Sequence, residues 1–310
     1  MPLVQDHPFG AATRLRFATV QEGQAAIATE DDWTVATSPF LRSATMALPP
    51  AIQVPLPRFL GYLKGTVKAW DEASQELWQP LLPALAQTFE RFRIPLPPQV
   101  LLVRTDGRDW AHAPYTRGHA VFLPDGLRHD GYSRLEVLAH ELVHIATRHH
   151  PAWASRLYQL LGFREVAPLQ WPVEWLGVRL ANPDATHAQH AIHLTLPDGR
   201  RVDAMPVLVA RRPMLRPGET VLDLMEVRLV EVQVVPGQPT RPVRSKGLPV
   251  WHATTAVPDY LRQLGGNTSY IDHPEEVLAD NIAFLVSGRP VRNPLLLALI
   301  EALMKPVAQP

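Results

Sequence analysis

Two histidines and a glutamate form the most informative cluster in this sequence, His140-Glu141-Leu142-Val143-His144. On a helix, residues four positions apart project from the same face, so the two imidazoles can bind one metal ion. Glu141 would then lie beside the metal, where its carboxylate can act on a bound water. With 13 histidines in 310 residues, chance alone produces this pattern in roughly three of a hundred chains of this composition. The motif therefore favours a metal centre over the alternative, a helix with two hydrogen-bonded, buried histidines.

The segment that carries this motif, residues 133–149, has the sequence of a helix. Ser133 is a good N-cap residue, and Glu136 follows three positions later, which is the spacing of a capping box. Apolar residues recur at intervals of three and four along one face, and Pro151 ends the helix near His149. A strand at residues 118–123 precedes it, and we expect this strand to offer a sheet edge to an extended peptide.

The motif resembles that of the zincin metallopeptidases, in which a third protein ligand completes the metal site. In the metzincin branch the motif continues to a glycine and a third histidine. Here His150 occupies the histidine position, but Thr147 stands where the glycine belongs. A β-branched residue suits a left-handed turn poorly, so His150 is the alternative third ligand and not the preferred one. His149 and His150 are equally explained as basic residues near a helix C-terminus.

A second pair of residues supplies the preferred ligand. Glu276 and Asp280 are four positions apart in a segment with helical periodicity, so both carboxylates project from one face. They resemble the ExxxD pair of the glutamate-zincin, thermolysin-like branch. That resemblance implies Glu276 as third metal ligand and Asp280 as the acceptor that orients a ligating histidine. Glu275 is the runner-up ligand, and a solvated helix face is the alternative for the pair.

The resemblance also implies a mechanism, with one bound zinc ion and a peptide or protein as substrate. Glu141 would act as general base, taking a proton from the metal-activated water and returning it to the leaving amine. The developing oxyanion needs a further donor. We take Tyr270 as that donor because it lies just before the Glu276 helix. The other candidates are His273, His252 and Tyr260.

Three more histidines are evenly spaced by three, His187, His190 and His193. Their segment has the pattern of a strand, in which positions three apart point to opposite faces. Their side chains would therefore diverge, and we expect no second metal site there.

Composition excludes several classes of protein. The chain has no cysteine, so disulfide scaffolds, thiol nucleophiles and cysteine-ligated metals are ruled out. Its formal net charge is zero, which argues against binding nucleic acid or an anionic membrane. No apolar run approaches the ~20 residues of a membrane helix, and the N-terminus lacks the apolar core of a signal peptide. We therefore expect a cytoplasmic protein. Its oligomeric state and cleavage preference are not encoded in these patterns.

The predicted fold class is α+β: a zincin-like core, with a small sheet, the active-site helix and C-terminal helices, interrupted by a β-rich module. Strands at residues 191–196 and 201–209 flank a turn and form a hairpin, and a long strand with a β-bulge at Leu229-Val230 spans residues 219–235. We expect four regions, which are 1–57 of unclear fold, 58–186 with the motif helix and edge strands, 187–250 as the inserted β-rich module, and 251–310 with the third ligand.

A different class of function remains open. The same fold can serve as a non-catalytic metal-binding or interaction protein, in which the β-rich module binds a partner. The intact Glu141 argues against this, because a site without catalysis has no need of that carboxylate.

Overall fold

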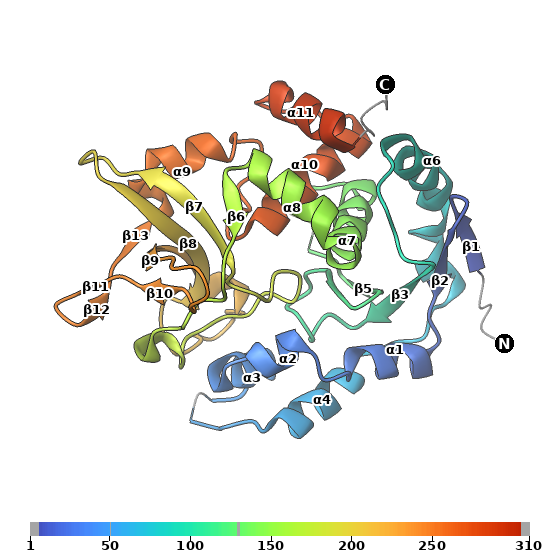
Figure 1. The fold of residues 1–310 in the computed structure, drawn as a ribbon. Helices are drawn as coiled ribbons and strands as arrows, with labels where there is room; N and C mark the ends of the chain where they lie inside the picture. Colours follow the sequence, from blue (N-terminus) through green and yellow to red (C-terminus); the bar gives the residue numbers. More distant parts are fainter. Residues whose placement is uncertain (1–5, 50, 129–130, 305–310) are drawn as a thin grey trace. The chain divides into compact units, whose positions relative to one another are not determined.

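The computed structural model describes residues 6–49, 51–128 and 131–304 (Figure 1), so the outer ends of the expected regions 1–57 and 251–310 lie outside the described residues. The protein is of the mixed α+β class, as predicted. Its contacts divide it into two units. The first comprises Met1–Glu30, Pro55–Ala154 and Ala279–Pro310, and the second comprises Asp31–Val54 and Ser155–Leu278. The last of these divisions falls inside one continuous helix, α10 (Pro274–Ser287).

The first unit contains a five-stranded sheet in the order β1-β2-β3-β5-β4. Its strands are β1 (Asp6–Phe9), β2 (Thr13–Phe17), β3 (Gln99–Thr105), β4 (Tyr115–Arg117) and β5 (Ala120–Pro124). The neighbours β2, β3 and β5 run parallel, while β1 and β4 run antiparallel to theirs. Its helices are α1 (Val20–Ile27), α4 (Leu56–Lys64), α5 (Glu72–Glu76), α6 (Leu82–Phe92), α7 (Arg134–His149) and α11 (Pro294–Met304).

The prediction that residues 118–123 offer a free sheet edge is wrong. Strand β5 lies between β3 and β4, so both of its edges are paired. The cause is a tight hairpin, because Gly118 takes a φ of 56° between β4 and β5 and folds β4 back along β5. Tyr115 stacks on Phe122 across this hairpin, with ring centroids 4.7 Å apart. Strand β4, not β5, is therefore the edge strand on this side of the sheet.

The second unit contains a larger antiparallel sheet, in the order β10-β9-β8-β7-β6, with β13 also paired to β9. Its strands are β6 (Phe163–Glu165), β7 (His190–Thr195), β8 (Arg201–Ala210), β9 (Met225–Gln233), β10 (Arg241–Pro242) and β13 (Trp251–Ala253), while β11 (Arg244–Ser245) and β12 (Leu248–Pro249) pair separately. The predicted hairpin is confirmed, since β7 and β8 pair antiparallel across the turn that joins them. An apolar core that includes Met205, Val207 and Val230 lies on this sheet.

The predicted long strand at residues 219–235 is wrong in length, and its predicted bulge is absent. Strand β9 begins only at Met225, because Glu219 and Asp223 accept hydrogen bonds from nearby backbone N–H groups and hold the preceding residues in a turn. The register of β9 on β8 is unbroken from Met225 to Glu231. Residues Leu229 to Val232 are buried without alternation because both faces of the sheet are covered there, and this burial produced the apparent shift of phase.

Short helices hold one loop of the second unit in place. They are α2 (Asp32–Ala36) and α3 (Pro39–Thr45), and the same unit contains α9 (Pro258–Gln263) and most of α8 (Pro151–Leu160). The indole N–H of Trp33 donates to the carbonyl of Ala181 at 2.8 Å, and the hydroxyl of Ser38 donates to the carbonyl of Arg179 at 2.8 Å. The N-terminal segment thus fixes the backbone of residues 179–181, which borders the candidate site.

Among the described residues, no helix combines the length and apolar character needed to cross a membrane.

Candidate metal centre

The motif helix α7 forms where the sequence predicts it. The hydroxyl of Ser133 accepts from the backbone N–H of Glu136 at 3.2 Å, and the Glu136 carboxylate accepts from the Ser133 N–H at 2.7 Å. This reciprocal capping box satisfies two backbone donors at the start of the helix and sets its phase. With that phase, His140, Glu141 and His144 are all buried.

Helix α10 runs antiparallel to α7, as two sets of contacts show. The Glu136 carboxylate accepts from the Ser287 hydroxyl and the Arg289 guanidinium, both at 3.0 Å. One turn later on α7, Nδ1 of His140 lies 2.8 Å from Oδ1 of Asp280. Residue numbers thus rise along α7 as they fall along α10. A further turn along both helices brings His144 and Glu276 to the same level.

His140, His144 and Glu276 form a buried group that can hold a metal ion. Each offers one ligand atom, and these atoms lie within 4.8 Å of one another. Among the described residues, His150 belongs to no such group. It caps the C-terminus of α7 and is only half-buried.

Asp280 orients the imidazole ring of His140 through a hydrogen bond. Its Oδ1 faces Nδ1 of His140, and its Oδ2 accepts from the hydroxyl of Tyr132 at 2.7 Å. Because a carboxylate oxygen accepts, Nδ1 of His140 is the donor, and the other ring nitrogen, Nε2, is left to bind a metal. Sequence reasoning missed Tyr132, since it stands directly before the N-cap and belongs to no spacing pattern.

Asn182 holds the carboxylate of Glu276 in place. Its amide nitrogen donates to Oε1 of Glu276 at 2.7 Å, and it lies 3.2 Å from the hydroxyl oxygen of Tyr270 and 3.4 Å from Oδ2 of Asp272. Two amide hydrogens are thus shared among three acceptors, with Glu276 the closest. Sequence reasoning missed Asn182 too, because it lies in a loop 94 positions from Glu276 and carries no motif.

The structure also separates the two neighbouring glutamates. Glu275 accepts a short hydrogen bond from the hydroxyl of Tyr158, and its backbone N–H donates to Nδ1 of His273 at 3.1 Å. Its carboxylate is thus engaged away from the two motif histidines. Only Glu276 joins them in a group with metal-ligand spacing among the described residues, which favours Glu276 over Glu275 as the third ligand.

Tyr270 lies close to Glu276 through their common neighbour Asn182. Desolvation of its hydroxyl, followed by the negative charges of Glu276 and Asp272, raises the pKa of Tyr270 well above its ordinary value. The residue as a whole keeps 37% exposure, so the ring edge faces solvent while the hydroxyl end is buried. The hydroxyl therefore stays protonated, and its oxygen accepts from the amide of Asn182.

The other three donor candidates are engaged elsewhere. The hydroxyl of Tyr260 donates to the carbonyl of Ile271 at 2.5 Å, and Nε2 of His252 lies 2.7 Å from the carboxylate of Glu231. His273 caps the start of α10, and its Nε2 lies 3.2 Å from Nδ1 of His190.

The three evenly spaced histidines do not converge. His187 pairs with Asp32 at 3.1 Å and His193 pairs with Asp203 at 3.2 Å, both at the surface. His190 is buried beside His273. Among the described residues, none of the three belongs to a group with metal-ligand spacing.

Comparison with known proteins adds no family to this picture. No family model matches the chain, and no curated protein or solved structure matches it either. The donor set of the buried site and the helices that position it therefore carry the functional argument.

Proposed function

We propose that this protein is a zinc-dependent metallopeptidase that hydrolyses peptide bonds with Glu141 as general base. The observation that carries the proposal is the buried group of His140, His144 and Glu276. Glu141 lies between the two histidines on α7 and is 3% exposed. The hydrogen bond from His140 to Asp280 adds support, because such an outer acceptor commonly accompanies a metal-bound imidazole.

The donor set fits zinc in a catalytic role. Two imidazoles and one carboxylate are three protein ligands, which is the number that catalytic zinc sites use when they keep a fourth position open. A bound zinc ion would supply a water of lowered pKa and would polarise the carbonyl of the peptide bond. The absence of cysteine from the chain agrees with a site built of histidine and carboxylate.

The chain's own residues would then perform the proton transfers. Glu141 accepts a proton from the attacking water on its carboxylate and returns it to the nitrogen of the leaving amine, so its charge is restored at the end of the cycle. Tyr270 stays protonated and donates a hydrogen bond to the carbonyl oxygen as negative charge develops there. Asp280 keeps His140 in the tautomer that presents Nε2.

The test is cleavage of a diverse peptide library by the purified protein, with and without a zinc chelator. We expect cleavage that the chelator abolishes and that added zinc restores. Glu141→Gln should keep its zinc and lose hydrolysis, because an amide cannot accept the proton. Cleavage that persists in Glu141→Gln contradicts the general-base role. Absence of any chelator-sensitive cleavage by the wild type favours the non-catalytic, partner-binding alternative.

A further inference from the structure

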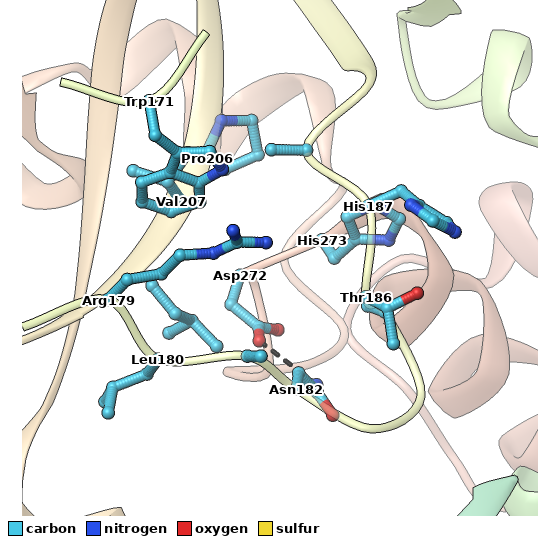
Figure 2. Close-up of a pocket in the computed structure, with 14 residues that line it drawn as sticks. Trp171, Arg179, Leu180, Asn182, Thr186, His187, Pro206, Val207, Asp272 and His273 are labelled. Carbon is cyan, nitrogen blue, oxygen red and sulfur yellow. Dashed lines mark hydrogen bonds between the residues drawn. The ribbon is translucent and has the colours of Figure 1, made fainter. Parts of the chain in front are cut away.

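A pocket in the second unit borders the loop that carries Asn182 (Figure 2). Its empty volume is about 340 Å³, a figure that includes space open to solvent. One wall is apolar and includes Trp171, Pro206 and Val207. Polar side chains also line the pocket, and of these Arg179 and Asp272 carry charge. Such a mixture of apolar surface and few polar groups is typical of a site that recognises one part of a ligand.

Among the described residues that line this pocket, Arg179 is the only arginine or lysine. Its guanidinium extends into the pocket (Figure 2), with its carbon 4.5 Å from the ring centroid of Trp171. Among the described residues, its Nε is buried without a hydrogen-bond partner. Burial lowers the pKa of Arg179 from its ordinary value, and no neighbouring charge opposes that shift. A partly buried cation without a paired anion is costly, and a bound anion would offset that cost.

Hydrogen bonds to neighbouring segments hold the backbone around Arg179 in place. Arg179 forms an isolated antiparallel bridge with Val209 of β8, and its carbonyl accepts from Ser38. The next residue, Leu180, donates its N–H to Leu208 at 3.1 Å. The indole of Trp171 then supplies a flat surface on which the guanidinium stacks. Such support is what a preorganised recognition site requires.

The pocket shares residues with the candidate metal centre. Asn182 lines the pocket and donates to Glu276, the third residue of the metal-binding group. Asp272 also lines it, but its Oδ2 lies 3.4 Å from the Asn182 amide, so its charge is partly satisfied. An anion in the pocket would therefore lie on the Arg179 and Trp171 side. A singly charged, planar carboxylate suits that side, whereas Asp272 opposes a dianion.

We propose that this pocket is a substrate subsite in which Arg179 binds a carboxylate of the peptide; the assignment rests on the proposed peptidase function. The carboxylate has two possible sources, which are an aspartate or glutamate side chain near the cleaved bond and the free C-terminus of the substrate. Both present the same planar pair of oxygens to the guanidinium, which can bind them with two parallel hydrogen bonds.

The experiment starts from a peptide that the wild type cleaves and compares four versions of it. The residue next to the cleaved bond is Glu or Gln, and the C-terminus is free acid or amide. We expect kcat/KM to fall about 10- to 100-fold when the recognised carboxylate is neutralised, as for loss of a hydrogen-bonded charged group. The neutralisation that causes the fall identifies the source. Equal rates for all four peptides in the wild type overturn the proposal, whatever the variants do.

Variants assign the effect to Arg179. Arg179→Gln should lose the preference, and Arg179→Lys, which keeps the charge but not the planar pair of donors, should retain part of it. Arg201→Gln is the matched control, because Arg201 is an exposed arginine at the start of β8 outside the pocket. Its preference should equal that of the wild type. A preference that survives intact in a folded Arg179→Gln protein overturns the assignment.

The subsite and the proposed function can fail separately. If no peptide is cleaved, the peptidase function fails, and the subsite is then tested by calorimetric binding of the Glu and Gln peptides, each with a free or amidated C-terminus. A carboxylate-dependent affinity that falls about tenfold or more in Arg179→Gln supports the subsite. Affinities independent of the carboxylate, or unchanged in Arg179→Gln, overturn it. If peptides are cleaved without any carboxylate preference, the function stands and only the subsite fails.

Discussion

The two carboxylates that α10 contributes to the candidate centre, Glu276 and Asp280, each accept a hydrogen bond from a donor outside the motif. Asp280 lies between His140 and Tyr132, and Glu276 accepts from Asn182. These neighbours leave each ligand little freedom, so a metal would meet donors that are already oriented.

This arrangement predicts graded effects on zinc affinity. Asp280→Asn should weaken zinc binding about 10- to 100-fold, because an amide is a poorer acceptor for the His140 N–H and can present its own donor instead. Tyr132→Phe should weaken it less, since Asp280 itself remains. Competition with a chromogenic chelator measures both affinities. Tyr62→Phe is the control, because the Tyr62 hydroxyl donates to the Arg108 carbonyl in an exposed contact and Tyr62 belongs to no group with metal-ligand spacing among the described residues. Unchanged affinity in Asp280→Asn would contradict the orienting role.

A buried histidine predicts how stability depends on pH. Burial first, then the neighbouring His273 and His187, lower the pKa of His190 from 6.5 to about 3. Between these values the unfolded chain binds a proton that folded His190 does not. Stability therefore falls as the pH decreases from 6.5 towards 3, by up to about 1.4 kcal/mol per pH unit from this group.

The check is the free energy of unfolding in urea between pH 7 and pH 4. His190→Gln should show a shallower loss than the wild type over this range, because it lacks the titrating group. His193→Gln, which changes an exposed histidine paired with Asp203, should keep the wild-type slope. The same slope in His190→Gln and the wild type would show that the side chain is protonated in the folded protein.

At the scale of elements, two helices bring the site together. Helix α7 depends on its capping box, and the capping residue Glu136 also accepts from Ser287 and Arg289 at the far end of α10. One buried carboxylate, 4% exposed, thus fixes both the start of α7 and its alignment with α10. The capping pattern predicted α7 from the sequence because it is local, whereas the second role of Glu136 involves residues 151 positions away.

Two substitutions separate these roles. Ser133→Ala should cost about 1 kcal/mol of stability, the usual value of an N-cap. Glu136→Ala should cost more, about 2 to 4 kcal/mol, because it removes the cap and also one acceptor of both Ser287 and Arg289. Each keeps a backbone carbonyl as a second acceptor and Arg289 is partly exposed, which limits the loss. Urea unfolding measures both. Equal losses in the two variants would mean that Glu136 acts only as a cap.

At the scale of the molecule, the candidate ligands come from distant parts of the chain. The two histidines lie on α7, and 131 residues separate His144 from Glu276. Most of the intervening residues belong to the second unit, which contains the antiparallel sheet and the pocket lined by Arg179. Binding of zinc to this group should therefore stabilise the fold as a whole, since the unfolded chain has no preformed site.

Removal of the metal tests this expectation. Chelation should lower the Tm and zinc should restore it, with a stabilisation of about 4 kcal/mol when free zinc exceeds Kd a thousandfold. The wild type should bind one zinc, and Glu276→Ala should lose it. His150→Ala should keep it. Loss of zinc in His150→Ala alone would assign the third ligand to that histidine and contradict the choice of Glu276.

The sequence by itself determined the features that depend on neighbours along the chain. Helix α7 follows from its cap and apolar periodicity, the β7–β8 hairpin follows from its turn, and the four-residue spacings place His140 with His144 and Glu276 with Asp280 on common faces. Tertiary structure decided the rest. In the folded protein β4 is the edge strand and β9 has no bulge. Both features depend on how strands pair and on which segments cover the sheet, and these contacts join residues far apart in the sequence.

Tertiary structure also supplied Tyr132, Asn182 and Arg179, which no motif marks. Their roles depend on side chains that meet across as many as 148 positions of sequence, and such contacts are fixed by packing rather than by local pattern.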